Sequence, residues 1–111
     1  MNAQNLHREA MEIANKAFEA QKANRHSEYI QLTTAAFEKE KVAAWTLFTE
    51  MEAEPTRSIL FRSAAQLAFN CGKMREAEQL ISAALAGSPP IEIRRELRAL
   101  LKIVLLSLEV S

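Results

Sequence analysis

The chain has 111 residues, with 14 basic and 14 acidic side chains and a net charge of zero at neutral pH. Two glycines, one cysteine and two histidines exclude a glycine-rich phosphate loop, a structural zinc site and an internal disulfide. The zero net charge argues against a dedicated nucleic-acid-binding protein. Because helix-forming residues dominate and β-branched residues are sparse, we expect one all-α domain over residues 1–111.

The first half of the chain predicts two helices. Apolar residues recur at helical spacing in the first, which should end near Asn24 because asparagine tolerates the left-handed conformation. Ser27 is placed to cap the second helix. Residues 27–52 contain neither glycine nor proline, so we expect one unusually long helix there. A break near Glu38–Glu40 is the alternative.

The second half predicts three further helices. Pro55 suits the first turn of the third helix, where a missing N–H costs nothing, and Gly72 ends that helix. The fourth helix is expected over 74–86, ending at Gly87. Ser88 and the two prolines after it then start a fifth helix, which reaches nearly to the C-terminus. Short connections between helices predict antiparallel hairpins.

The segment 58–91 contains a large aromatic, small residues and a turn glycine in the first helix of a pair, and small and bulky apolar residues with a terminal proline in the second. These residues are Phe61, Ala65, Gly72, Ala77, Ile81, Ala84, Leu85 and Pro89. With them the segment resembles one tetratricopeptide repeat of the kind found in small bacterial repeat proteins. The family usually has leucine and tyrosine where this chain has Ala64 and Ala68. The stretch Glu54–Ser58 is similar to one in small bacterial repeat proteins. The resemblance implies a right-handed stack of antiparallel helical hairpins with a C-terminal capping helix.

An earlier, degenerate repeat can be placed in two registers. One takes Asn24 as the turn, Ala17 as the small packing residue and Ala36–Phe37 as the closing pair. The other places Ala43 and Pro55 one period, about 34 residues, before the corresponding residues of the clear repeat. The first register is favoured, because no helix-breaking residue interrupts the second predicted helix.

The resemblance also implies where a ligand lies, because the family binds peptides against the first helix of each pair. Carried over to the clear repeat, the partner-binding residues are Ile59, Arg62, Gln66, Phe69 and Asn70. Arg62, Gln66 and Asn70 are spaced by four residues and share one helix face. An arginine beside two amides can hold a peptide carboxylate. The alternative is a solvated helix face.

The last predicted helix is apolar almost all round near its C-terminal end. A helix that covers one end of a stack needs only one apolar stripe. The remainder is expected to be covered by a second copy of the chain, by a partner, or by the long second helix folding across it. Self-association as a homodimer is favoured over complete burial within one chain. The residues expected to self-associate are Leu101, Val104, Leu105, Leu106 and Leu108.

A basic stripe on the same helix suggests an alternative function. Arg94, Arg98 and Lys102 are spaced by four residues, and Arg95 is adjacent. Such a stripe can bind an anionic partner or a nucleic acid. No aromatic residues interleave with it for base stacking, so a solvated helix face is the plainer interpretation.

No acid, base and nucleophile are placed to act together. Cys71 precedes the turn glycine at a helix C-terminus, where a thiolate is disfavoured. His7 and His26 lack partners at metal-ligand spacing, so we expect them at the surface. Trp45 is expected to anchor the core or an interface. The sequence therefore predicts a non-catalytic protein-interaction module without cofactor or metal.

The expected location is the cytoplasm. The N-terminal residues mix charged and apolar side chains, unlike a signal peptide. The longest apolar run, Ile103–Leu106, is much shorter than the ~20 residues that cross a membrane. A lone Cys71 needs no oxidising compartment.

Overall fold

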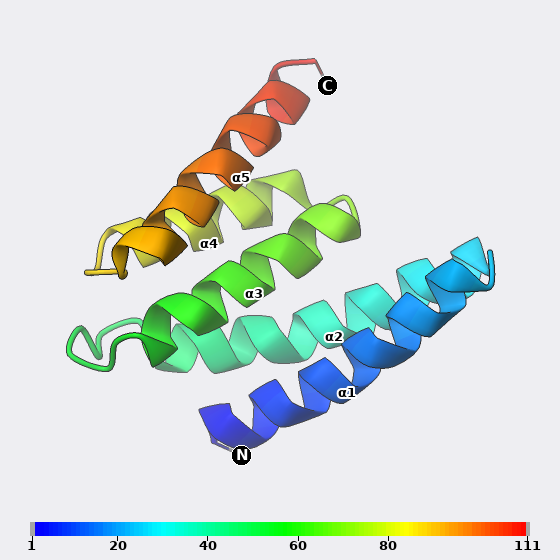
Figure 1. Cartoon of the computed structure of the whole chain (residues 1–111), viewed down its shortest axis with the longest axis horizontal. Coiled ribbons are helices and arrows are strands. Elements are labelled where there is room, and N and C mark those ends of the chain that lie inside the picture. Colours follow the sequence, from blue (N-terminus) through cyan, green and yellow to red (C-terminus); the bar gives the residue numbers. More distant parts are fainter. Residues whose placement is uncertain (1, 111) are drawn as a thin grey trace.

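The computed structural model describes residues 2–110, which form five helices and no strand. The helices are α1 (Ala3–Lys22), α2 (His26–Thr46), α3 (Thr56–Asn70), α4 (Met74–Leu85) and α5 (Ile91–Glu109). The molecule measures 40 × 37 × 20 Å, a thickness of two helix layers. Viewed along the short axis, α1, α3 and α5 lie in the nearer layer, with α2 and α4 behind them (Figure 1). The all-α prediction is confirmed.

Two turns of the same geometry close the α1–α2 and α3–α4 hairpins. Asn24 has a φ of 60° and Gly72 a φ of 82°, the left-handed values that asparagine and glycine tolerate best. In each turn the N–H of the next residue donates back to an alanine carbonyl oxygen, that of Ala20 at 2.9 Å and that of Ala68 at 2.8 Å. This bond satisfies a carbonyl that the helix end leaves without a partner. Both predicted helix ends are confirmed.

The second helix is continuous through Glu38–Glu40 but shorter than predicted. It ends at Thr46, not at residue 52, and with 21 residues it is hardly longer than the 20-residue α1. Its first residue is His26, so Ser27 lies inside the first turn and caps nothing. The expected long second helix and its serine cap were therefore wrong.

A set of short turns replaces the predicted last six residues of α2. Residues 47–53 form hydrogen bonds three residues apart, beginning with the Leu47 N–H to the Ala44 carbonyl oxygen at 3.0 Å. The carbonyl oxygen of Phe48 instead accepts two hydrogen bonds from the Arg57 side chain, both at 3.0 Å. Arg57 thus occupies the carbonyl oxygen of Phe48, which would accept a backbone N–H if α2 continued. The periodicity of apolar residues does not reveal that a side chain competes for this oxygen.

The start of α5 also differs from the prediction. The helix begins at Ile91 after Pro90, and no side chain caps it. The Ser88 side chain does not cap this helix, and the backbone N–H of Ser88 donates to Glu54 Oε2 at 3.3 Å.

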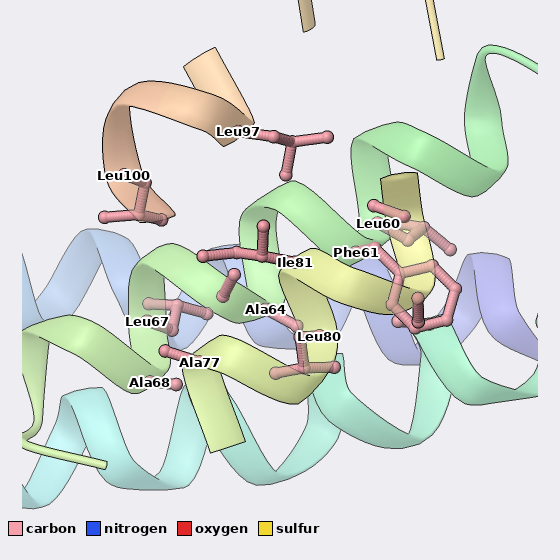
Figure 2. Close-up of a cluster of buried hydrophobic side chains, with 14 of the residues drawn as sticks. Leu60, Phe61, Ala64, Leu67, Ala68, Ala77, Leu80, Ile81, Leu97 and Leu100 are labelled. Carbon is pink, nitrogen blue, oxygen red and sulfur yellow. The ribbon is translucent and has the colours of Figure 1, made fainter. Parts of the chain in front are cut away.

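The core lies between α3 and α4 and is completed by α2 and α5 (Figure 2). The α3 alanines Ala64, Ala65 and Ala68 are fully buried, as are Ala77 and Ala84 of α4. Small side chains let the two helices approach closely. The bulk of the core comes from larger buried residues: Phe37, Leu60, Phe61, Leu80, Ile81, Leu97 and Val104. Burial of each stabilises the fold by about 1.5–3 kcal/mol.

Candidate functional site

A groove runs between α1 and α3 in the nearer helix layer. Its larger part is a cavity of about 390 Å³ lined by Met11, Ala14, Arg62, Ser63, Gln66, Leu67, Glu96 and Leu100. A smaller hollow of about 190 Å³ shares Ala14 and Leu67 with it and extends to Asn70 and Phe18. The two therefore form one groove, bounded by α1 and α3 and closed at one end by α5. Its lining combines apolar side chains with polar ones, and the buried Thr33 of α2 lines the smaller hollow.

Three of the five predicted partner-binding residues line this groove. Arg62 and Gln66 lie in its larger part and Asn70 in the smaller hollow. Ile59 and Phe69 are half-buried and pack against the core, so they lie outside the groove lining. The spacing of four residues places the three polar residues along one face of α3, as predicted.

The polar residues of the groove are already hydrogen-bonded. Arg62 Nη1 lies 3.1 Å from Glu96 Oε2 of α5, and Gln66 Nε2 donates to Asn70 Oδ1 at 2.9 Å. The Arg62–Glu96 pair was not foreseen, because it joins residues 34 apart. The Glu96 side chain is 58% exposed, so an incoming carboxylate competes with a partly solvated carboxylate for Arg62.

A buried carboxylate lies beneath the groove and joins three helices. Glu40 of α2 is fully buried, and His7 Nδ1 of α1 lies 2.8 Å from its Oε2 and 3.0 Å from its Oε1. Burial raises the pKa of Glu40, while hydrogen bonds from Ser63 of α3 and from His7 oppose that rise. His7 was expected at the surface but is half-buried here. The cluster therefore links α2 to α1 and α3.

The predicted self-association residues divide into two groups. Val104 is fully buried, and Leu101 and Leu108 are half-buried and pack against the core. Leu105 and Leu106 are exposed, by 39% and 62% of their surface. Ile103 and Val110 are exposed as well, so an apolar surface does remain on the outer side of α5.

The residues of the predicted basic stripe differ in their exposure. Arg94 is half-buried, and its Nη2 lies 3.4 Å from the Pro89 carbonyl oxygen. Arg95, Arg98 and Lys102 are exposed and form no ion pair with any residue of 2–110.

A second hollow opens between the C-terminal ends of α2 and α4, in the other helix layer. We call it the aromatic hollow; its volume is about 430 Å³ and its lining residues are Trp45, Phe48, Glu78, Gln79, Ser82, Ala83 and Ala86. Trp45 and Phe48 are 40% and 39% exposed. Their ring centroids lie 5.3 Å apart, and Trp45 meets the buried Phe61 edge-on at 5.1 Å. Trp45 therefore anchors the core with one edge and faces solvent with the other.

A fully buried arginine holds this hollow together from beneath. The Arg57 side chain donates to the Phe48 carbonyl oxygen and, from Nη2, to the Ala83 carbonyl oxygen at 3.0 Å. Its guanidinium carbon lies 5.6 Å from the centre of the Phe48 ring and 5.1 Å from that of Phe61. Arg57 thus ties the end of α2 to the end of α4. This role of Arg57 was not predicted, although Arg57 lies within the stretch Glu54–Ser58.

The remaining candidate groups carry no site. Cys71 is half-buried, and burial raises the pKa of its thiol, which disfavours the reactive thiolate. Residues 2–110 contain no cluster of His, Cys or acidic side chains placed to hold a metal ion. In the same range, no helix is long and apolar enough to cross a bilayer.

Comparison with protein-family models, with curated proteins and with solved structures finds no match to this chain.

Proposed function

We propose that this chain is a non-catalytic protein-interaction module that binds an extended peptide in the α1–α3 groove. The observation that carries this proposal is the groove itself, whose lining combines the apolar Met11, Leu67 and Leu100 with Arg62, Gln66 and Asn70. An extended peptide presents backbone N–H and C=O groups that amide side chains can bind, and apolar side chains that the apolar part of the lining can cover.

The same proposal includes a tetratricopeptide-like arrangement of the hairpins. It is supported by the left-handed turn at Gly72 and by the buried alanines on both α3 and α4. In such an arrangement the first helices of successive hairpins line one face, and α1, α3 and α5 are the helices that line the groove. A cytoplasmic location completes the proposal, since nothing about Cys71 requires oxidation.

Peptide selection on the intact chain tests the groove. A phage library of ten-residue peptides is selected on the full chain, and enriched peptides are titrated against two variants. Ala14→Trp fills the groove, because Ala14 lines both of its parts. Ala35→Trp places the same side chain at an exposed position of α2 and is the matched control. We expect Ala14→Trp to weaken binding at least tenfold and Ala35→Trp to leave it unchanged. Absence of saturable binding, or equal binding to both variants, would count against the proposal.

Self-association through α5 is the second part of the proposal. Leu105 and Leu106 are exposed on a helix whose opposite side is buried in the core. Exposed leucines beside other exposed apolar residues favour an interface over a solvated surface. Sedimentation velocity over a range of concentrations measures the association directly, and replacing both leucines with glutamate should leave a monomer.

The alternative function is binding of an anionic partner or nucleic acid by Arg95, Arg98 and Lys102. It is favoured by their exposure and by their lack of an ion pair within residues 2–110. Binding of this kind weakens steeply as salt increases, because it releases counterions. A lack of RNA and DNA binding at low salt would remove this alternative.

A further inference from the structure

The groove between α1 and α3 extends beyond its smaller hollow to the turn that joins α1 to α2. There it meets a further hollow of about 250 Å³, which we call the turn hollow and which is lined by Gln21, Asn24, His26 and Tyr29. The turn hollow shares Gln21 and Tyr29 with the smaller hollow. Consecutive hollows thus have lining residues in common, and one groove leads from α5 to the α1–α2 turn.

The two ends of this groove differ in charge. Near α5 the lining contains the ion pair of Arg62 and Glu96. Among residues 2–110, neither the smaller hollow nor the turn hollow is lined by a lysine, an arginine or a glutamate. Lys22 Nζ lies 4.8 Å from the centre of the Phe18 ring but belongs to neither lining. A charged group bound in the smaller hollow would therefore lose water without gaining an ion pair from the lining.

Thr33 of α2 lines the smaller hollow and has a hydroxyl group without a hydrogen-bond partner. The residue is 1% exposed, and its Oγ1 has no partner within residues 2–110. Because α2 lies in the layer behind α1 and α3 (Figure 1), Thr33 lines the side of the hollow that faces the interior. A buried hydroxyl without a partner destabilises a fold, so its presence beside a hollow needs a reason.

Other hydroxyl groups in the helices of this chain donate to a carbonyl oxygen of their own helix. Thr34 donates to Ile30 at 2.7 Å, Thr46 to Ala43 at 2.7 Å and Ser107 to Ile103 at 3.0 Å. This local bond is open to a threonine in a helix, because a carbonyl oxygen three or four residues earlier lies within reach. The Thr33 hydroxyl does not form it, so its capacity to donate and to accept is left for another group.

We propose that the smaller hollow binds an asparagine or glutamine side chain of the peptide, with the amide hydrogen-bonded to Thr33 Oγ1. This inference rests on the proposed peptide binding and names the side chain that the groove selects. An amide offers both a donor and an acceptor, as a hydroxyl does. Asn70 Oδ1 already accepts from Gln66, so Asn70 offers its Nδ2 to the oxygen of the same amide.

Other classes of side chain fit the smaller hollow less well. An apolar side chain would leave the Thr33 hydroxyl buried without a partner, and a charged one would find no ion pair in the lining. A site that hydrogen-bonds its ligand rejects an analogue that lacks the bonding group, because the group in the site then stays unpaired.

The amide reaches Thr33 by displacing side chains on the solvent side of the hollow. Phe18 is 56% exposed and Gln21 is exposed, and both belong to the lining. Exposed side chains change rotamer within nanoseconds, so they can make way for a ligand without a change in the fold.

Parallel peptide selections test the inference. Thr33→Val keeps the shape of the side chain and removes the hydroxyl. Thr34→Val is the matched control, because the Thr34 hydroxyl is bonded within α2 and lies outside the groove lining. The ten-residue peptide library is selected on the unmodified chain and on both variants, and chemical denaturation checks that the variants fold. We expect asparagine or glutamine to be enriched at one peptide position on the unmodified chain and on Thr34→Val, and apolar residues to replace it on Thr33→Val.

Titration of single peptides measures the contact directly. One enriched peptide is made with its amide residue, with the acid of the same shape, and with an apolar residue of the same length. We expect the unmodified chain to bind the amide peptide roughly tenfold more tightly than either analogue. For Thr33→Val the amide and apolar peptides should bind within about threefold of each other, and Thr33→Ser, which restores a hydroxyl, should regain the preference. The comparison on the unmodified chain depends on no variant.

The contrary outcomes are distinct. If Thr33→Val keeps the preference for the amide, the hydroxyl does not contact the peptide, and the inference is wrong while the proposed groove stands. If the unmodified chain binds the apolar or the acidic peptide as tightly as the amide peptide, the inference is again wrong. If no peptide binds saturably, or Ala14→Trp binds as well as Ala35→Trp, the proposed function fails and the inference fails with it.

Discussion

The α1–α2 and α3–α4 hairpins have the same turn and are held together by different forces. Asn24 and Gly72 occupy matching left-handed positions, 48 residues apart, with matching backbone hydrogen bonds. Beyond the turn the hairpins diverge. The α3–α4 pair buries leucine, isoleucine and phenylalanine, whereas the α1–α2 pair buries one large apolar side chain, Phe37, and its other buried apolar residues are alanines.

Two polar contacts also join the helices of the first hairpin. Glu40 binds His7 inside the hairpin, and Lys39 Nζ lies 3.0 Å from Glu9 Oε1 nearer its surface. Polar contacts of this kind depend on pH and salt, whereas aliphatic packing does not. The two hairpins show that the same turn can direct the backbone in the same way while different contacts stabilise each hairpin. The difference also explains the groove, because small residues on α1 leave space facing α3.

The largest expected effect comes from one matched position in the two hairpins. Ile81 of α4 and Thr33 of α2 each lie nine residues after the left-handed residue of their turn, and both are buried. Ile81→Ala should lower the free energy of unfolding by about 3 kcal/mol through lost burial and a new cavity. Chemical denaturation measures the change.

Substitution of Thr33 should raise the free energy of unfolding, whereas substitution of Ile81 lowers it. Its Oγ1 is buried and has no hydrogen-bond partner within residues 2–110. Thr33→Val keeps the shape and removes the hydroxyl, so we expect a gain of up to about 1 kcal/mol. A large loss for Thr33→Val would show that the first hairpin relies on this hydroxyl, contrary to the comparison.

Gly87 tests the connection between the hairpins. A methyl group there would collide with Arg57 Nη1 and lie 3.3 Å from Glu54 Oε2, so Gly87→Ala should cost about 2 kcal/mol. Gly72→Ala is the matched control, because open space surrounds that position and only the left-handed backbone is strained, at about 1 kcal/mol. In an Arg57→Met background the cost of Gly87→Ala should shrink; equal costs in both backgrounds would refute the collision.

The pH dependence of stability should originate in the first hairpin. Burial raises the pKa of Glu40 above its ordinary value of 4.5, so the folded state binds a proton more tightly than the unfolded state. The stability that this group contributes is complete below pH 4.5 and is lost as the pH rises through the raised pKa. Relative to Glu40→Gln, the unmodified chain should therefore become less stable across that interval. The exposed Glu38→Gln variant is the control and should track the unmodified chain.

The smallest effect is expected from exchanging the turn residues. Gly72→Asn and Asn24→Gly each place a tolerated residue in a left-handed conformation, so each should change stability by no more than about 0.5 kcal/mol. Asn24→Ala, in contrast, should cost about 1 kcal/mol. Thermal unfolding of the three variants decides whether the two turns are equivalent.

Local chemistry made several features predictable from the sequence. The helical class, the ends of α1 and α3 and the shared face of Arg62, Gln66 and Asn70 follow from spacing and from left-handed residues, which act over one or two turns. The apolar surplus on α5 was visible for the same reason, although a one-dimensional pattern could not separate the buried Val104 from the exposed Leu106.

Only the tertiary structure decided the features that join distant segments. The end of α2 depends on Arg57, which takes the carbonyl oxygen of Phe48; the Glu40–His7 pair joins residues 33 apart; and the Arg62–Glu96 pair joins residues 34 apart. The aromatic hollow likewise exists only where α2 and α4 end together. The sequence determined which segments become helices, because helix formation depends on neighbouring residues. Packing determined where polar groups find partners, because a buried charge or carbonyl is stabilised by whichever group the fold brings within reach.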